Sequence, residues 1–136
     1  MTLSQIADEF DLDMVYAFGS RGREIAGWIK GEISALRNST SSDVDIGVKP
    51  RPGKKLTLKE KVRLSILFEE LFSVNRVDLV VIPEADPFLA ANIIRGERIY
   101  RRDEYAADEY DLYILRRAGD LAPLEKERIA LIMGTD

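Results

Sequence analysis

Three short apolar segments, each ended by turn-forming residues, constrain the fold of this chain most strongly. They are residues 14–18 (MVYAF), 43–48 (DVDIGV) and 76–82 (RVDLVVI), and they run into Gly-Ser, into prolines and into Pro83, respectively. Apolar or alternating runs of this length, bounded by Gly and Pro, are typical of β-strands. Segments with helical spacing lie between them, so the pattern predicts an α/β or α+β sandwich in which helices flank a small mixed sheet.

The segments between these strands show the periodicity of amphipathic helices. Thr57 and Glu60 form a capping-box pattern at the start of a helix expected to run to about residue 73. Further helices are expected at residues 3–10, 21–37 and 87–94, and a short edge strand at residues 98–101. From about residue 103 the chain is expected to be helical to its end, with a break near Gly119–Pro123.

The size and composition favour one domain, expected to cover residues 1–136 with a C-terminal helical segment from about residue 103. Hydrophobic residues make up 46% and charged residues 32%, which supplies one core and gives no sign of global disorder. No apolar run approaches the ~18 residues that a membrane span requires, and the N-terminus lacks a signal-peptide pattern. No membrane association and a cytoplasmic location are therefore expected.

Cysteine and histidine are both absent, which narrows the possible chemistry. Their absence excludes disulfides, thiolate nucleophiles, imidazole bases and cysteine-based zinc sites. Acid–base or metal chemistry must then use carboxylates, and oxygen ligands favour Mg²⁺ or Mn²⁺. The net charge of −4 argues against direct nucleic-acid binding, but it leaves room for a local cationic pocket that holds a nucleotide.

The first candidate feature is Gly19-Ser20, at the end of a predicted strand and just before a predicted helix. Glycine lets the backbone approach a phosphate closely, and the N–H groups that begin a helix attract anions. The hydroxyl of Ser20 adds a donor, and Arg21 and Arg23 lie where they could reach phosphates. A plain turn for Gly-Ser and a solvated helix face for the arginines fit the same residues.

The second and third candidate features are acidic. Asp43 and Asp45 are two residues apart in a strand, so their side chains share a face with Cα atoms roughly 6–7 Å apart, which suits one or two metal ions. Asp78 lies in an otherwise apolar strand, where a carboxylate is costly unless a cation or donors compensate it. The alternatives are a pair of solvated acids at a strand entry and, for Asp78, an exposed strand start bonded to a loop.

In chain order, these features form strand–Gly-Ser–helix, then Asp-x-Asp on a strand, then a lone Asp on a later strand. This order resembles the DNA polymerase β-like nucleotidyltransferase superfamily, and the short length resembles its minimal nucleotidyltransferase (MNT) group. The resemblance implies that Gly19 and Ser20 bind the triphosphate. It also implies that Asp43 and Asp45 bind two Mg²⁺ ions, and that Asp78 completes the cluster and activates the acceptor.

The segment after Gly-Ser both matches and departs from this family. Arginines just after Gly-Ser reach the phosphates in the family, which implies the same for Arg21 and Arg23. Residues 21–42 separate Gly-Ser from Asp-x-Asp, which is longer than the usual separation, and they contain Trp28 and the polar loop Asn38–Ser42.

Proteins of the MNT group resemble antitoxins paired with a HEPN-domain RNase toxin. The resemblance implies a metal-dependent protein adenylyltransferase that moves AMP from ATP to a tyrosine of the toxin. Two alternatives stay open. One is a nucleotidyltransferase for a small acceptor of the aminoglycoside type, and the other is a non-catalytic antitoxin that acts by binding alone.

Overall fold

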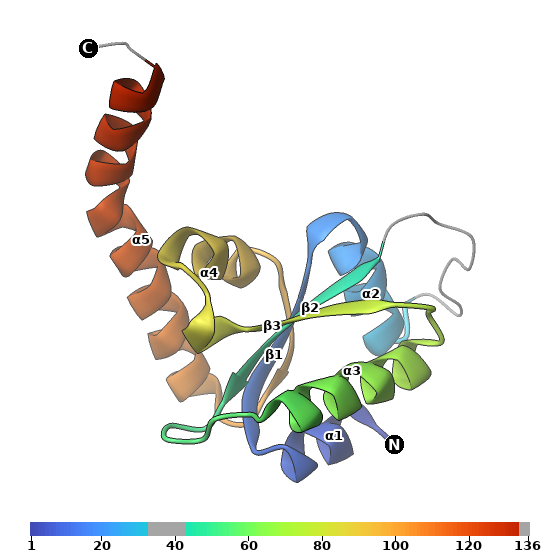
Figure 1. Ribbon diagram of the computed structural model, residues 1–136. Helices are drawn as coiled ribbons and strands as arrows, with labels where there is room; N and C mark the ends of the chain where they lie inside the picture. Colours follow the sequence, from blue (N-terminus) through green and yellow to red (C-terminus); the bar gives the residue numbers. More distant parts are fainter. Residues whose placement is uncertain (33–42, 134–136) are drawn as a thin grey trace.

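The structure is a computed structural model that describes residues 1–32 and 43–133 (Figure 1). Its strands are β1 (Leu12–Phe18), β2 (Val44–Pro50), β3 (Val77–Val81) and β4 (Glu97–Arg101). Its α-helices are α1 (Leu3–Glu9), α2 (Gly22–Ile29), α3 (Leu58–Phe72), α4 (Pro87–Ile94) and α5 (Glu104–Met133). Short 3-10 turns follow β1 at Gly19–Arg21 and β3 at Ile82–Glu84.

The four strands form one mixed sheet in the order β3-β2-β1-β4. β1 pairs antiparallel with both β2 and β4, and β2 pairs parallel with β3. The crossover from β2 to β3 runs through α3, because parallel neighbours need a connection long enough to return the chain to the same end. The predicted mixed sheet flanked by helices is confirmed, with β4 at an edge as expected.

Helices cover both faces of the sheet. Residues of α1, α2 and α3 pack with Val44, Ile46 and Val48 of β2 in one apolar cluster. The helices α4 and α5 cover the opposite face, where they form a second cluster with alternate residues of β1. Side chains alternate along a strand, so Asp45, Gly47 and Lys49 point toward the α4/α5 face.

Local sequence signals fix several of the helix starts. Thr57 accepts from the backbone N–H of Glu60, and the Glu60 side chain accepts from the backbone N–H of Thr57, so the predicted capping box is present. A second capping box joins Thr2 and Gln5 at the start of α1. The side chain of Asp86 caps the N-terminus of α4. Pro87 follows at the first helical position, where proline is favoured.

The last helix corrects one expectation. α5 runs without a break from Glu104 to Met133, so the predicted interruption near Gly119–Pro123 is wrong. A proline inside a helix removes one backbone donor, and here the helix continues past that loss. Figure 1 shows the C-terminal half of α5 extending beyond α4, away from the rest of the molecule.

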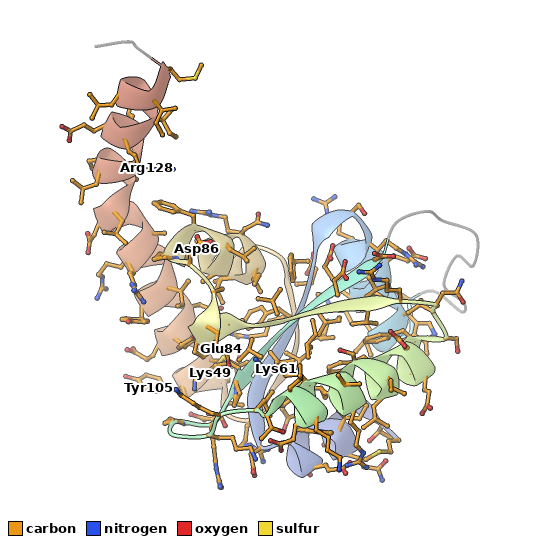
Figure 2. The ribbon with its side chains drawn as sticks, viewed as in Figure 1. Lys49, Lys61, Glu84, Asp86, Tyr105 and Arg128 are labelled. Carbon is orange, nitrogen blue, oxygen red and sulfur yellow. The ribbon has the colours of Figure 1, made fainter. Side chains whose placement is uncertain are left out.

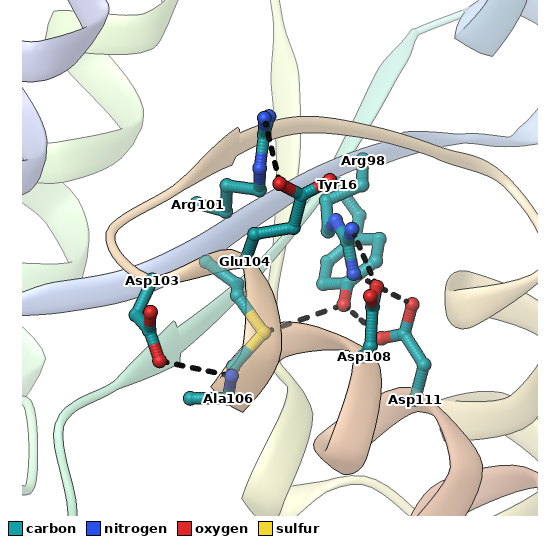
Figure 3. Close-up of polar contacts among 9 residues, drawn as sticks. Tyr16, Arg98, Arg101, Asp103, Glu104, Ala106, Asp108 and Asp111 are labelled. Carbon is teal, nitrogen blue, oxygen red and sulfur yellow. Dashed lines mark hydrogen bonds and ion pairs between the residues drawn. The ribbon is translucent and has the colours of Figure 1, made fainter.

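A polar cluster joins β1, β4 and α5 on the α4/α5 face (Figure 3). The hydroxyl of the fully buried Tyr16 donates to Asp111 of α5. Arg98 of β4 binds Asp111 with an N–O distance of 3.1 Å and Asp108 with one of 2.9 Å. Burial, followed by the hydrogen bond to Asp111, raises the pKa of Tyr16 far above its usual value, so the phenol stays a donor.

Some predicted boundaries differ from the structure. The first strand begins at Leu12, and the helix after Gly-Ser covers Gly22–Ile29, while the predicted extension to residue 37 and the loop Asn38–Ser42 fall largely outside the described residues. Trp28 packs edge-on against Phe72 at 5.8 Å between ring centroids, so it belongs to the core. Within residues 1–32 and 43–133, no helix is long and apolar enough to cross a membrane.

Candidate functional site

The structure brings two of the predicted aspartates into direct register. Asp45 of β2 and Asp78 of β3 are partners in the parallel pair, so their Cα atoms lie about 4.8 Å apart and their side chains share the α4/α5 face. Asp43 immediately precedes β2 on that face. Burial, followed by the charges of Asp78 and Asp43, raises the pKa of Asp45. The part of this shift that comes from Asp78 and Asp43 is the effect expected of carboxylates held close together.

The turn after β1 lies on the other side of Asp45. Phe18 is the register partner of Asp45, and Gly19 follows it with a φ of 73°. A Cβ built on Gly19 would stand 2.2 Å from Oδ2 of Asp45, so only glycine fits. The predicted Gly-Ser turn therefore touches the predicted Asp-x-Asp segment through the backbone of Gly19.

Arg76, the residue just before β3, lies against these carboxylates. Nε of Arg76 is 3.5 Å from Oδ2 of Asp43 and 3.3 Å from Oδ1 of Asp78. The Arg76 side chain is 70% exposed, which makes it easy to displace. Sequence reasoning missed Arg76, although its position two residues before Asp78 on an alternating strand places both side chains on one face.

The carboxylates fit a hard divalent cation by their chemistry, though not by their present side-chain positions. Within the described residues, no three acidic side chains converge closely enough to hold one metal ion. Yet the three acids lie on one face at the start of β2 and β3, and a guanidinium bridges two of them. Oxygen ligands and a local need for positive charge suit Mg²⁺, so Asp43, Asp45 and Asp78 are the residues that would hold it.

The residues that follow Gly19 take different positions. Ser20 is exposed, and Arg23 is exposed at the start of α2. Arg21 is only 5% exposed, and its Nε contacts Glu24 at 3.1 Å. No side chain caps the N-terminus of α2, so its first amides can face an anion. The contacts with phosphate that the sequence predicts for Ser20, Arg21 and Arg23 stay predictions. To contact a phosphate, the Arg21 side chain would have to break its ion pair with Glu24.

A cavity of about 330 Å³ opens beside Gly19. Its lining combines Gly19, Gly22 and Arg23 with Asn92 of α4 and with Arg95, which directly follows that helix. Sequence reasoning missed Asn92 and Arg95, because nothing near them in the chain marks them, and only the packing of α4 on the sheet brings them to Gly19. The cavity offers two guanidinium groups, an amide and one carboxylate, that of Glu97, and it borders Gly19, which lies against Asp45. Its two guanidinium groups and its amide suit a nucleotide.

Comparison with known families adds to this geometry. Residues 2–105 match the family described as "Polymerase beta, Nucleotidyltransferase". This range includes the Gly-Ser turn and all three aspartates. Among proteins with curated functions, none matches this chain.

Solved structures share the fold at low sequence identity. A chain of a toxin–antitoxin structure with AMP-PNP aligns with a TM-score of 0.69 and 16% identity, over 96% of this chain and 95% of that chain. A chain of a Shewanella oneidensis complex, in which a tri-AMPylated HEPN toxin is bound to an MNT antitoxin, aligns with a TM-score of 0.68 and 16% identity, over 96% and 92%. Another Shewanella oneidensis structure aligns with a TM-score of 0.61 and 20% identity, over 96% and 90%.

Proposed function

Because this chain belongs to the polymerase β nucleotidyltransferase family, we propose that it is an antitoxin that transfers AMP from ATP to a tyrosine of a HEPN-domain toxin. The observation that carries the site assignment is the position of Asp45. It lies between Gly19 on one side and its register partner Asp78 on the other. A phosphate-binding turn and a paired carboxylate thus meet at one point.

The nucleotide is assigned to the cavity beside Gly19. The backbone of Gly19, the hydroxyl of Ser20 and the first amides of α2 bind the triphosphate, with Arg23 and Arg95 supplying positive charge. ATP is favoured as the substrate because a fold relative was solved with AMP-PNP. This chain is 16% identical to that relative, so ATP as its substrate belongs to what we propose here.

The residues of this chain position the reacting groups. Asp43 and Asp45 would hold two Mg²⁺ ions with Asp78, and the ions would neutralise charge on the triphosphate and lower the pKa of the acceptor hydroxyl. Asp78, 43% exposed, can also accept the proton of the attacking hydroxyl. The acceptor oxygen bonds to the α-phosphorus, the bond from that phosphorus to the β-phosphate oxygen breaks, and pyrophosphate leaves.

A protein acceptor suits the exposed carboxylates at the start of β2 and β3. The side chains of Asp43 and Asp78 are 38% and 43% exposed, so a tyrosine carried on a partner can reach them. Contact across the partner's surface supplies binding energy that the small site need not provide. The fold relative that contains an AMPylated HEPN toxin supports this choice of partner.

The test is to incubate this chain with ATP, Mg²⁺ and the HEPN-domain protein that the proposal expects to be encoded beside it, and to measure the intact mass of that protein. We expect the mass of one or more AMP units on a tyrosine, and RNase activity lost in proportion. Asp78→Asn should form the complex but transfer no AMP. Asp120→Asn, an exposed position on α5, is the matched control and should transfer normally.

Three results would contradict the proposal in distinct ways. If the toxin is inhibited without gaining AMP, this chain acts by binding alone. If Asp78→Asn transfers AMP as fast as the control, the site is misassigned. Transfer to an aminoglycoside-type acceptor but not to the toxin would move the function to small molecules.

A further inference from the structure

A second cavity lies on the same face of the sheet, beyond α4. Its volume is about 500 Å³, within the range of sites for small molecules. Lys49 borders it, four residues after Asp45 in β2 and therefore about 13 Å away. Between them, Ile93 of α4 packs on Gly47 so tightly that a Cβ there would approach Ile93 Cγ2 to 2.5 Å. The cavity is thus separate from the carboxylate site.

Apolar and aromatic groups form the inner wall of this second cavity. Ile82, Ala90 and Ile114 are buried there. Tyr110 of α5 lies beside Tyr113, with ring centroids 6.2 Å apart, and the ammonium of Lys49 is 5.2 Å from the Tyr110 ring centroid. Figure 2 shows Lys49 near Glu84 and Lys61, where the strands β2 and β3 end.

The rim of the cavity is cationic although the protein carries a net charge of −4. Its charged lining consists of Lys49, Arg51, Lys54, Lys55, Arg117 and one acid, Glu84. The acid is paired with Lys61 of α3 at 2.7 Å. Three of the cations contact acids outside the lining, at 3.6 Å for Lys49, 3.7 Å for Arg51 and 3.1 Å for Lys54.

Two cations remain for a ligand. Among the described residues, no carboxylate lies within ion-pair distance of Lys55 or Arg117. The Tyr110 hydroxyl likewise makes no hydrogen bond within the described part of the chain, and burial raises its pKa to about 12, so at neutral pH it is a donor. A phosphate monoester carries about −1.5 to −2 charge at pH 7, which two cations balance.

We propose that this cavity binds a small aromatic phosphate, with its ring against Tyr110 and Ile114 and its phosphate on Lys55 and Arg117. The aromatic wall selects a flat apolar body, since ring faces stack on one another and bury apolar surface. Arginine and lysine provide charge-assisted hydrogen bonds to the phosphate. The site is independent of the carboxylate cluster, so it stands whether or not the proposed transfer reaction is correct.

The experiment is a ¹H–¹⁵N NMR titration of the intact chain with AMP in the absence of divalent cations. We expect shifts at residues 53–56, 81–85 and 110–117. Phenyl phosphate should produce the same shifts. Inorganic phosphate and adenosine should each bind at least about tenfold more weakly, because each lacks half of the recognised chemistry.

Matched variants separate a site from general attraction. Lys55→Glu with Arg117→Glu should weaken AMP binding at least about tenfold. The control, Lys59→Glu with Arg116→Glu, makes the same charge change at exposed cations outside the cavity lining and should bind within twofold of the original chain. Tyr110→Leu should weaken AMP binding but leave inorganic phosphate binding unchanged, and circular dichroism confirms that each variant is folded.

Three results would overturn the proposal. The shifts with AMP could be confined to residues 19–23 and 92–97, which would place binding at the other cavity. The two double variants could lose affinity equally, which would show long-range charge attraction only. Finally, AMP and phenyl phosphate could leave the spectrum unchanged at millimolar concentration.

Discussion

Gly19 and Asp45 are in such close contact that no side chain fits between them: a Cβ on Gly19 would stand 2.2 Å from Oδ2 of Asp45. The contact joins the turn after β1 to the second strand. It brings the Gly-Ser and Asp-x-Asp features together in space, although Gly19 and Asp43 are 24 positions apart in the sequence (43 − 19 = 24).

Gly19→Ala is therefore expected to abolish AMP transfer. The added methyl would push Asp45 aside, and the left-handed φ of 73° would add about 1 kcal/mol of strain. Gly31→Ala is the control, because Gly31 has a φ of 77° and open space around its Cβ position. Both variants carry the strain of a left-handed φ, but only Gly19→Ala also displaces Asp45, so only Gly19→Ala should lose activity while both remain folded in urea unfolding. Equal AMP transfer by the two variants would show that the contact between Gly19 and Asp45 is not needed for activity.

Asp45→Asn is expected to stabilise the metal-free chain at pH 7 while removing Mg²⁺-dependent ATP binding. Burial and two neighbouring acids raise the pKa of Asp45, so its protonated form favours folding. The stabilisation from this group is present below its unfolded pKa and is lost as pH rises through the raised folded pKa. The advantage of Asn should accordingly grow from pH 3 to pH 7 in urea unfolding, with Asp120→Asn as the control. A less stable Asp45→Asn at pH 7 would contradict this.

Arg76→Gln is expected to strengthen Mg²⁺-dependent ATP binding. Arg76 contacts Asp43 and Asp78 and must leave before a metal can be bound there. Exposed ion pairs are worth at most about 1 kcal/mol, which corresponds to about fivefold in affinity. Calorimetric titration should show this gain, whereas Arg63→Gln, which breaks an exposed pair with Glu9 on the other face, should leave affinity unchanged. Weaker binding in Arg76→Gln would instead make Arg76 a ligand for the nucleotide.

Tyr16→Phe is expected to destabilise the fold by about 2 kcal/mol, because it removes a buried hydrogen bond to a carboxylate. Tyr113→Phe removes a hydroxyl from a side chain that is 53% exposed and should change stability by less than about 0.5 kcal/mol. Urea unfolding measures both. If Tyr16→Phe were as stable as the original chain, Arg98 alone would be enough to pair Asp111.

Gly47→Ala is expected to cost about 1–3 kcal/mol, because its Cβ would press on Ile93 Cγ2 at 2.5 Å and displace α4. Ile93→Leu removes that Cγ2 atom, so the double variant should recover part of the loss. A double-mutant cycle measures the coupling, and additive losses would contradict direct contact.

The strands and helix starts could be predicted where the deciding interactions are local. The capping box of Thr57 and Glu60 and the alternation from Val44 to Val48 lie within a few residues of sequence. Resemblance to a family supplied the connection between Gly19 and Asp45. The position of Asn92 and Arg95 beside Gly19 could not be predicted, since only the packing of α4 on the sheet brings them there.

The helix break predicted near Pro123 is wrong for a related reason. Proline raises the cost of a helix by a fixed amount, but whether the helix breaks depends on the residues on either side. The chain from Glu104 to Met133 continues as one helix through that position.

The hydrogen bond from Tyr16 to Asp111 spans 95 positions of the chain. A ribosome that adds 5–20 residues per second makes Asp111 on the order of ten seconds after Tyr16. Until then, the hydroxyl of Tyr16 lacks the carboxylate that accepts its hydrogen bond in the finished fold. A chain that ended before residue 111 would contain the Gly-Ser turn and all three acids but would lack this acceptor, and we expect it to be less stable than the full chain. The sheet that carries the proposed site therefore depends for its full stability on a helix that is made last.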